Sequence, residues 1–230
     1  MTKPMLLAEF TRLPPATRAI IFEGLSGAID LVAEAAPVSH RFLRYQWFAA
    51  ALLNYGGQAR TILVEHDGDP VIVLPMTLYG PGPARLVAVP GCAVPFRSFP
   101  ASMAADDNAY AALVDTLARE VNALRLGPIR DDDPGLAPLV AAARAKGWAA
   151  LDRCVATSVV VDVPSFQAAG HSAFWNSAAQ DGLLADAFSV AASRAGREST
   201  LRDWLLVRPG LPAMLGRMLR RGWGRDTSPS

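Results

Sequence analysis

The sequence lacks the features that mark disulfide-rich, nucleic-acid-binding, secreted and membrane proteins. It has two cysteines, Cys92 and Cys154, which are too few for a disulfide framework. We expect both to be buried, reduced thiols, because free cysteine usually behaves as a small core residue. A formal net charge of +1 favours neither nucleic acid nor an anionic membrane surface. The charged start does not read as a signal peptide, and no run reaches the roughly 18 apolar residues of a membrane span. The sequence therefore predicts a cytoplasmic protein with neither nucleic-acid nor membrane partners.

The common catalytic and metal-binding motifs are also missing. The sequence has no G-x-S-x-G elbow, no P-loop and no C-x-x-C pair, and no Ser/His/Asp set is apparent. The histidines, His40, His66 and His171, lack the spacing of metal ligands. Consecutive carboxylates such as 131–133 cannot all face one ion, so we interpret them as a helix-cap turn with solvated acids and expect no metal.

What is present is the composition of a packed globule. Hydrophobic residues make up 51% of the chain and charged residues 19%. Abundant alanine, proline, arginine and glycine with little lysine are typical of a GC-rich bacterial genome. The patterns predict three segments, namely a flexible leader (1–19), an α/β domain with a mixed sheet flanked by helices (20–165), and an irregular tail (166–230).

Several elements can be placed by pattern. Two β-rich runs, Arg60–His66 and Pro70–Leu78, flank an Asp-Gly turn and predict an antiparallel hairpin. Further strands are expected at 18–25, 85–89, 124–129, 148–152 and 157–163. Helices are expected near 27–36, from a Ser39 cap to Gly56, at 107–123, and from Asp133 to Gly147. Tyr45 and Trp47 are interpreted as core residues, and Leu201–Val207 as a short helix of the tail.

Two segments resemble the phosphate-cradling signature Q/R-x-x-G-x-G/A of acetyl-CoA binding. Arg144–Ala149 matches as text, but it ends a helix instead of starting one, so Gly147 is better explained as a helix C-cap. The segment 167–172 follows a strand, which is the right context, yet it has serine in the last place. Neither segment predicts a cofactor-binding residue.

The most unusual segment is the loop 90–100, rich in proline, glycine and aromatic residues. Phe96, Arg97 and Ser98 are our candidate substrate-binding residues. Arg97 in an aromatic setting could pair with an anionic group at the mouth of a concave site. The alternative is a rigid structural loop whose aromatics fill the core.

The order of short motifs resembles one acetyltransferase family. Arg41–Phe48, Arg60–Val64 with its Asp-Gly turn, Val73–Met76 and Phe96–Pro100 follow the order found in GNAT-like acetyltransferases of the CelD/BcsL type. The resemblance covers roughly residues 20–163, the N-terminal half of such proteins. It implies a GNAT fold and transfer of an acyl group from acetyl-CoA or another acyl-CoA to an amine. It identifies no catalytic residue, acyl acceptor or oligomeric state.

The chain departs from the family pattern in one respect. Proteins of the CelD/BcsL type have a basic segment at the start of their second half, and this sequence lacks it. Codons for Phe174–Asp181, read one base later, can encode Gly-Thr-Pro-Leu-Arg-Lys. We therefore hypothesise that 166–230 arose by a frameshift or truncation and lies outside the core. The chain would then be an incomplete transferase, or alternatively a non-catalytic GNAT-like binding or scaffold module. An α/β hydrolase is disfavoured by the absent nucleophile elbow.

Overall fold

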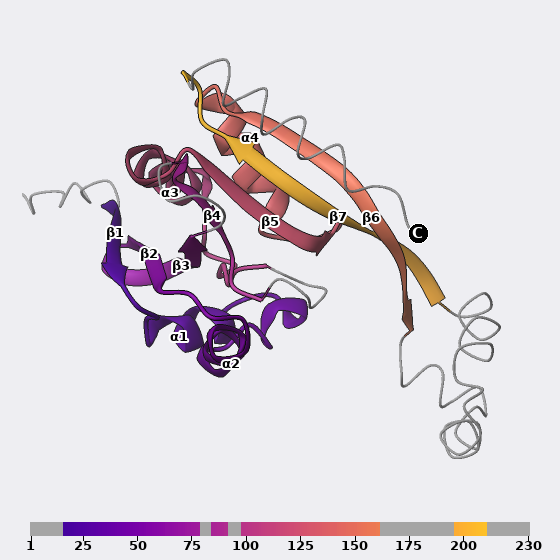
Figure 1. Cartoon of the computed structure of the whole chain (residues 1–230). Helices are drawn as coiled ribbons and strands as arrows, with labels where there is room; N and C mark the ends of the chain where they lie inside the picture. Colours follow the sequence, from indigo (N-terminus) through magenta and orange to yellow (C-terminus); the bar gives the residue numbers. More distant parts are fainter. Residues whose placement is uncertain (1–15, 79–83, 92–97, 162–195, 211–230) are drawn as a thin grey trace, which may run out of the picture.

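The computed structural model describes residues 16–78, 84–91, 98–161 and 196–210 (Figure 1). Along the chain its elements are β1 (Thr17–Glu23), α1 (Ala28–Glu34), the short helix η1 (Val38–His40), α2 (Tyr45–Tyr55), β2 (Ala59–His66), β3 (Asp69–Leu78), β4 (Leu86–Ala88), α3 (Asp107–Glu120), β5 (Ala123–Arg130), α4 (Leu136–Ala145), β6 (Ala149–Val161) and β7 (Gly196–Val207).

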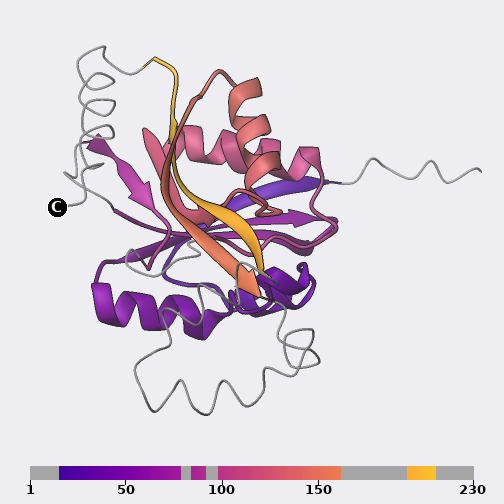
Figure 2. The same cartoon turned by 90° about the vertical axis from the view of Figure 1, so that its right-hand side faces the viewer.

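The described residues form a mixed α/β structure around one sheet of seven strands. A mixed sheet flanked by helices is what the sequence predicts. The strands lie in the order β1-β2-β3-β4-β5-β7-β6. All neighbours are antiparallel except β4 and β5, which are parallel. Figure 2 shows α1 and α2 on one face of the sheet and α3 and α4 on the other. Two layers of helix thus bury both faces of the sheet centre.

The predicted hairpin is confirmed, because β2 and β3 pair antiparallel, with Leu63 opposite Val73. Asp67 and Gly68 connect them with φ angles of 54° and 91°. Positive φ at both central residues is what a tight two-residue hairpin turn requires, which explains the Asp-Gly pair.

The helix predicted at 107–123 is also confirmed, as α3, and its apolar residues share one buried face. Tyr110, Leu113, Val114 and Leu117 are all at most 4% exposed, and Val121 just past the helix is 2% exposed. Their spacing places them on one side of the helix, against the sheet. Asp106 begins this helix by accepting a hydrogen bond from the Ala109 amide.

The parallel pair β4 and β5 is short, with Leu86 opposite Ala123 and Ala88 opposite Arg125. A last backbone hydrogen bond runs from the Val89 amide to the Arg125 carbonyl, at 3.4 Å. β5 continues beyond this point, while the chain after β4 leaves it. The chain returns beside β3 instead, where the Val73 amide donates to the Pro100 carbonyl at 3.1 Å. The parallel strands therefore separate towards their carboxyl ends.

The prediction for the tail is wrong where the structure describes it. Residues 196–207 form β7, a strand that lies between β5 and β6, and not a helix at Leu201–Val207. Since β7 occupies the interior of the sheet, the core extends at least to Val207 and does not end near residue 165. The segments 162–195 and 211–230 lie outside the described residues, and the frameshift stays a hypothesis.

Some smaller expectations also need correction. The two strands expected at 148–152 and 157–163 are one strand, β6, with an irregular register between Cys154 and Ala156. β1 begins at Thr17, inside the predicted leader. Of the two cysteines, Cys154 is free and exposed, because it lies on the outermost strand, and Cys92 is outside the described residues.

The first helices also differ from the expectation. Ser39 does not cap α2, because Val38–His40 form a separate short turn and α2 starts at Tyr45, whose amide donates to Asp30. Tyr45 is 39% exposed, so it is not a core residue. Trp47 packs its ring edge against Phe42 at 5.3 Å between centroids. No helix in the described part of the chain is long and apolar enough to cross a membrane.

Candidate functional site

A cavity of about 230 Å³ lies beyond the carboxyl end of β5. It is bordered by η1, the segment that leads into α3, and the turn between β5 and α4. Its lining residues are Ser39, His40, Phe42, Ser98, Arg130, Asp132, Asp133 and Pro134. Ligands of open α/β sheets commonly bind outside the carboxyl ends of strands, and this cavity lies outside the carboxyl end of β5.

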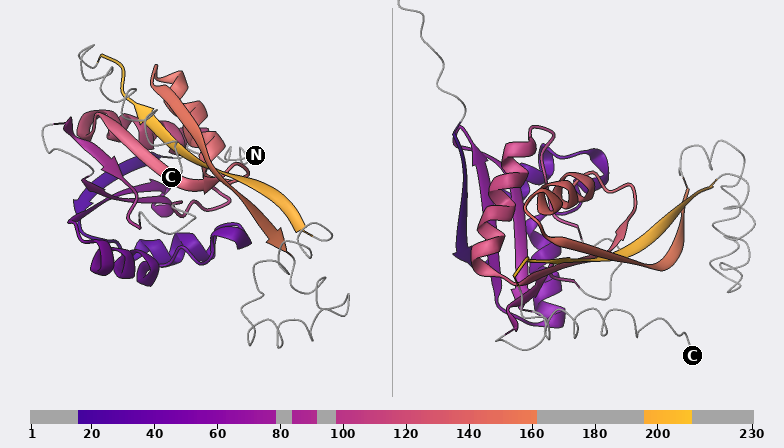
Figure 3. Two further views of the ribbon diagram at one scale, coloured as in Figure 1. Left: turned by 45° about the vertical axis from the view of Figure 1, so that its right-hand side comes forward. Right: turned by 90° about the horizontal axis from the view of Figure 1, so that it is seen from above.

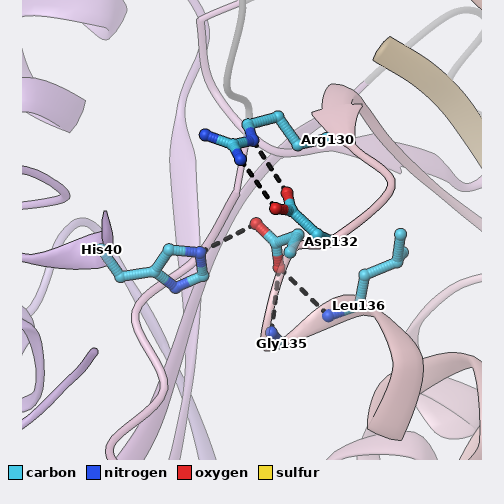
Figure 4. A network of polar contacts seen from close by, with 6 residues as sticks. His40, Arg130, Asp132, Gly135 and Leu136 are labelled. Carbon is cyan, nitrogen blue, oxygen red and sulfur yellow. Dashed lines mark hydrogen bonds and ion pairs between the residues drawn. The ribbon is translucent and has the colours of Figure 1, made fainter. Parts of the chain in front are cut away.

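The central contact of the cavity is a buried pair of side chains. His40 Nε2 lies 2.8 Å from Asp133 Oδ2, and the two side chains are 4% and 6% exposed. The other oxygen, Asp133 Oδ1, accepts hydrogen bonds from the amides of Gly135 at 2.9 Å and Leu136 at 3.1 Å (Figure 4). Asp133 therefore caps the start of α4, as predicted, and ties η1 to it.

With Asp133 ionised and His40 neutral, the contact between them assigns the ring proton of His40 to Nε2. An ionised carboxylate only accepts hydrogen bonds, so Nε2 must be the donor of this pair. In neutral imidazole the other nitrogen is then an acceptor. His40 Nδ1 is buried and has no hydrogen-bond partner. The pair thus holds an imidazole in one tautomer with an unused lone pair.

Ser98, one of the predicted substrate-binding residues, lines the same cavity. It is 1% exposed, and its hydroxyl has no hydrogen-bond partner. The neighbouring Phe99 is fully buried and lies where a Cβ on Gly135 would meet its ring at 3.2 Å. Phe96 and Arg97 lie outside the described residues, so their predicted roles stay predictions, as does the role of Ser98.

The rim of the cavity carries a second ion pair. Arg130 donates two hydrogen bonds to Asp132, at 2.8 and 2.7 Å, in the bidentate geometry shown in Figure 4. Their side chains are 21% and 39% exposed, so water reaches this pair. Asp132 and Asp133 therefore face different partners. Among the described residues no group of three His, Cys, Asp or Glu could hold a metal.

The buried face of α3 contributes Tyr110 near this site. Its pKa is raised from 10.0 to about 12, first by burial and second by the negative charge of Asp133. Both effects disfavour the phenolate, so the phenol remains neutral throughout the neutral range.

This shift predicts a stability change in alkaline solution. Because the folded pKa is the higher one, the folded state favours the protonated phenol. That contribution, roughly 3 kcal/mol, is fully present below pH 10 and is lost as the pH rises through about 12. We expect the stability difference between the wild type and Tyr110→Phe to shift by this amount over that range, measured by urea denaturation. An unchanged difference would show that Tyr110 ionises normally.

The other motifs of the sequence lie apart from the cavity. Gly147 ends α4 with φ of 77°, which confirms that Arg144–Ala149 is a helix end and not a phosphate cradle. His66 shares a hydrogen bond with Thr17 at the hairpin. His171 and the segment 167–172 lie outside the described residues.

Sequence reasoning missed a buried charge cluster in the sheet. Asp203 on β7 is 1% exposed and pairs with Arg125 of β5 at 2.8 Å and with Arg153 of β6 at 3.0 Å. The three strands are neighbours in the sheet, although they are distant in sequence. The charged residues of 197–203 come as two adjacent pairs of opposite sign, a pattern that is also common in loops and does not indicate a buried strand.

Comparison with known proteins adds little. No family model and no curated protein matches the chain. A solved structure from Desulfovibrio desulfuricans, described in the words "putative acetyltransferase of the GNAT family", is 9% identical and matches over 81% of this chain and 97% of that one, with a TM-score of 0.37. A likeness of this size carries no argument about the CelD/BcsL type or about activity. What the structure establishes is therefore a mixed α/β fold with a cavity beyond the carboxyl end of β5.

Proposed function

We propose that this chain is a GNAT-type N-acyltransferase domain, which transfers an acyl group from an acyl-CoA thioester to a small-molecule amine. The observation that carries the proposal is the cavity beyond the carboxyl end of β5, the strand that continues past the end of its parallel neighbour β4. From the order of its sequence motifs we also propose that the domain is of the CelD/BcsL type, and that the protein is cytoplasmic. The amine would attack the thioester carbonyl while a base accepts its proton.

The separation of β4 and β5 supports an extended acyl-carrying arm. Beyond Arg125, no strand of the described chain pairs with the β4 side of β5. A free strand edge binds amide-containing chains as an added strand would. The arm of coenzyme A contains amides, so it could lie along this edge and present its thioester to the cavity.

One observation favours a second candidate, the non-catalytic binding or scaffold module. Helix N-termini commonly bind phosphate groups through free amides and the helix dipole. Here the starts of α2, α3 and α4 are closed by the carboxylates of Asp30, Asp106 and Asp133. These charges oppose a pyrophosphate at the same places, so acyl-CoA would need another phosphate site.

Calorimetry and a transfer assay separate the two candidates. We expect acetyl-CoA to bind the full chain and free thiol to be released when a primary amine is added. Acetyl-pantetheine, which lacks the pyrophosphate, is the matched donor. Equal binding of both donors would show that the phosphates contribute nothing, in line with the closed helix termini. Absence of binding and of thiol release with either donor would refute the transferase and leave the binding module.

A further inference from the structure

Two buried polar atoms without partners border one cavity. His40 is 3% exposed and Ser98 is 1% exposed, and both line the hollow beyond β5. Neither His40 Nδ1 nor the Ser98 hydroxyl has a hydrogen-bond partner. A buried polar group without a partner is destabilising, and nearly all buried polar groups in folded proteins are paired. Two of them at one cavity indicate a ligand that would satisfy both.

The chemistry of these atoms restricts that ligand. Because Nε2 of His40 donates to Asp133, Nδ1 is an acceptor and needs an N–H or O–H. The serine hydroxyl can donate or accept. A carboxylate presents only acceptors, so it cannot satisfy Nδ1. A primary amine offers both hydrogens and a lone pair, and it therefore matches the two atoms together.

We infer that this cavity binds a primary amine through His40 Nδ1 and the Ser98 hydroxyl, and that His40 accepts the proton of that amine. The inference rests on the proposed acyl transfer and names its acceptor class and its base. As the amine nitrogen bonds to the thioester carbonyl carbon, its proton passes to Nδ1 and the carbon–sulfur bond breaks. The imidazolium then returns the proton to the departing thiolate, so the products are an amide and a free thiol.

Asp133 is the positioning residue in this arrangement. Its Oδ2 fixes the tautomer of His40, and its Oδ1 is held by the amides of Gly135 and Leu136 at the start of α4. The carboxylate also stabilises the imidazolium that forms when Nδ1 takes the proton. At the rim, Arg130 pairs with Asp132. The charge of Asp133 therefore acts mainly on His40.

Two substitutions at one position separate proton transfer from structure. In His40→Gln the side-chain amide can still donate to Asp133, but it cannot accept a proton. His40→Asn is shorter and keeps an acceptor while losing the donor to Asp133. We expect His40→Gln to keep the melting temperature and to lower kcat for thiol release by about 10²–10⁴-fold, the usual contribution of a general base. Full activity in His40→Gln with a destabilised His40→Asn would overturn the inference, since it would assign His40 to capping alone.

A binding experiment keeps the inference testable apart from catalysis. Wild-type protein with nitrogen-15 labelled histidine is titrated with propylamine and, as the matched anion, propionate. We expect the Nδ1 resonance of His40 to shift with propylamine and not with propionate, and the shift to be lost in Ser98→Ala. No response to propylamine, or a response to propionate, would overturn the inference. An amine response without thiol release would instead refute the proposed acyl transfer and leave an amine-binding site.

Discussion

Asp203→Ala is expected to lower the free energy of unfolding by about 3–5 kcal/mol. Removing one partner of a buried ion pair costs this much because the remaining charge stays uncompensated inside the protein. Here one carboxylate serves two guanidinium groups, Arg125 and Arg153, whose side chains are only 14% and 15% exposed. The loss would also put two like charges side by side across three adjacent strands.

The measurement is urea denaturation of the full chain, with Asp152→Ala as the matched control. Asp152 pairs with Arg202 on the same two strands, but the side chains are 36% and 37% exposed. An exposed pair of this kind contributes about 0–1 kcal/mol. Similar losses in the two variants would contradict the assignment of Asp203 as the charge that holds β5, β6 and β7 together.

Gly127→Ala is expected to destabilise the protein by about 3 kcal/mol or more, through strain and overpacking together. Gly127 has φ of 119°, which side chains rarely tolerate. A Cβ at this position would lie 2.6 Å from the Arg202 carbonyl oxygen and 2.7 Å from Asp203 Oδ1. Since the first of these atoms belongs to the backbone of β7, relief would require the strands to move apart.

Gly24→Ala separates the two causes of that loss. Gly24 also has a positive φ, of 87°, but a Cβ there would meet nothing within 4 Å. It should therefore show only the cost of backbone strain, about 1–2 kcal/mol. Equal thermal shifts for the two variants would show that close approach of β5 and β7 is not what requires glycine at 127.

The parts of the fold that the sequence predicts are those with local causes. The Asp-Gly turn predicts the β2–β3 hairpin, and the apolar spacing of Tyr110, Leu113 and Leu117 predicts α3. By contrast, β7 carries Arg202 and Asp203 in its interior, where a buried strand normally reads as apolar. Asp203 is matched by arginines on the two neighbouring strands and Arg202 by Asp152 on β6, and nothing local in the sequence shows these pairings.

The candidate site was predictable only in part. Loop composition drew attention to Ser98, which does line the cavity. His40 and Asp133 are 93 positions apart in the sequence. No motif or spacing in the sequence predicts that they pair. Each residue has an ordinary local explanation, a turn for His40 and a helix cap for Asp133. It is the packing of η1 against the start of α4 that places His40 beside Asp133.

The position of β7 has a consequence for synthesis of the chain. During translation β5 and β6 emerge first, and the strand that separates them in the sheet emerges later. Until then each presents a hydrogen-bonding edge without its partner. Figure 3 shows β6 and β7 running side by side beyond the rest of the sheet, a long ladder that forms only when β7 arrives. Exposed strand edges promote association between chains. Ribosome-bound chains that end before Gly196 should therefore depend on chaperones far more than chains that include β7.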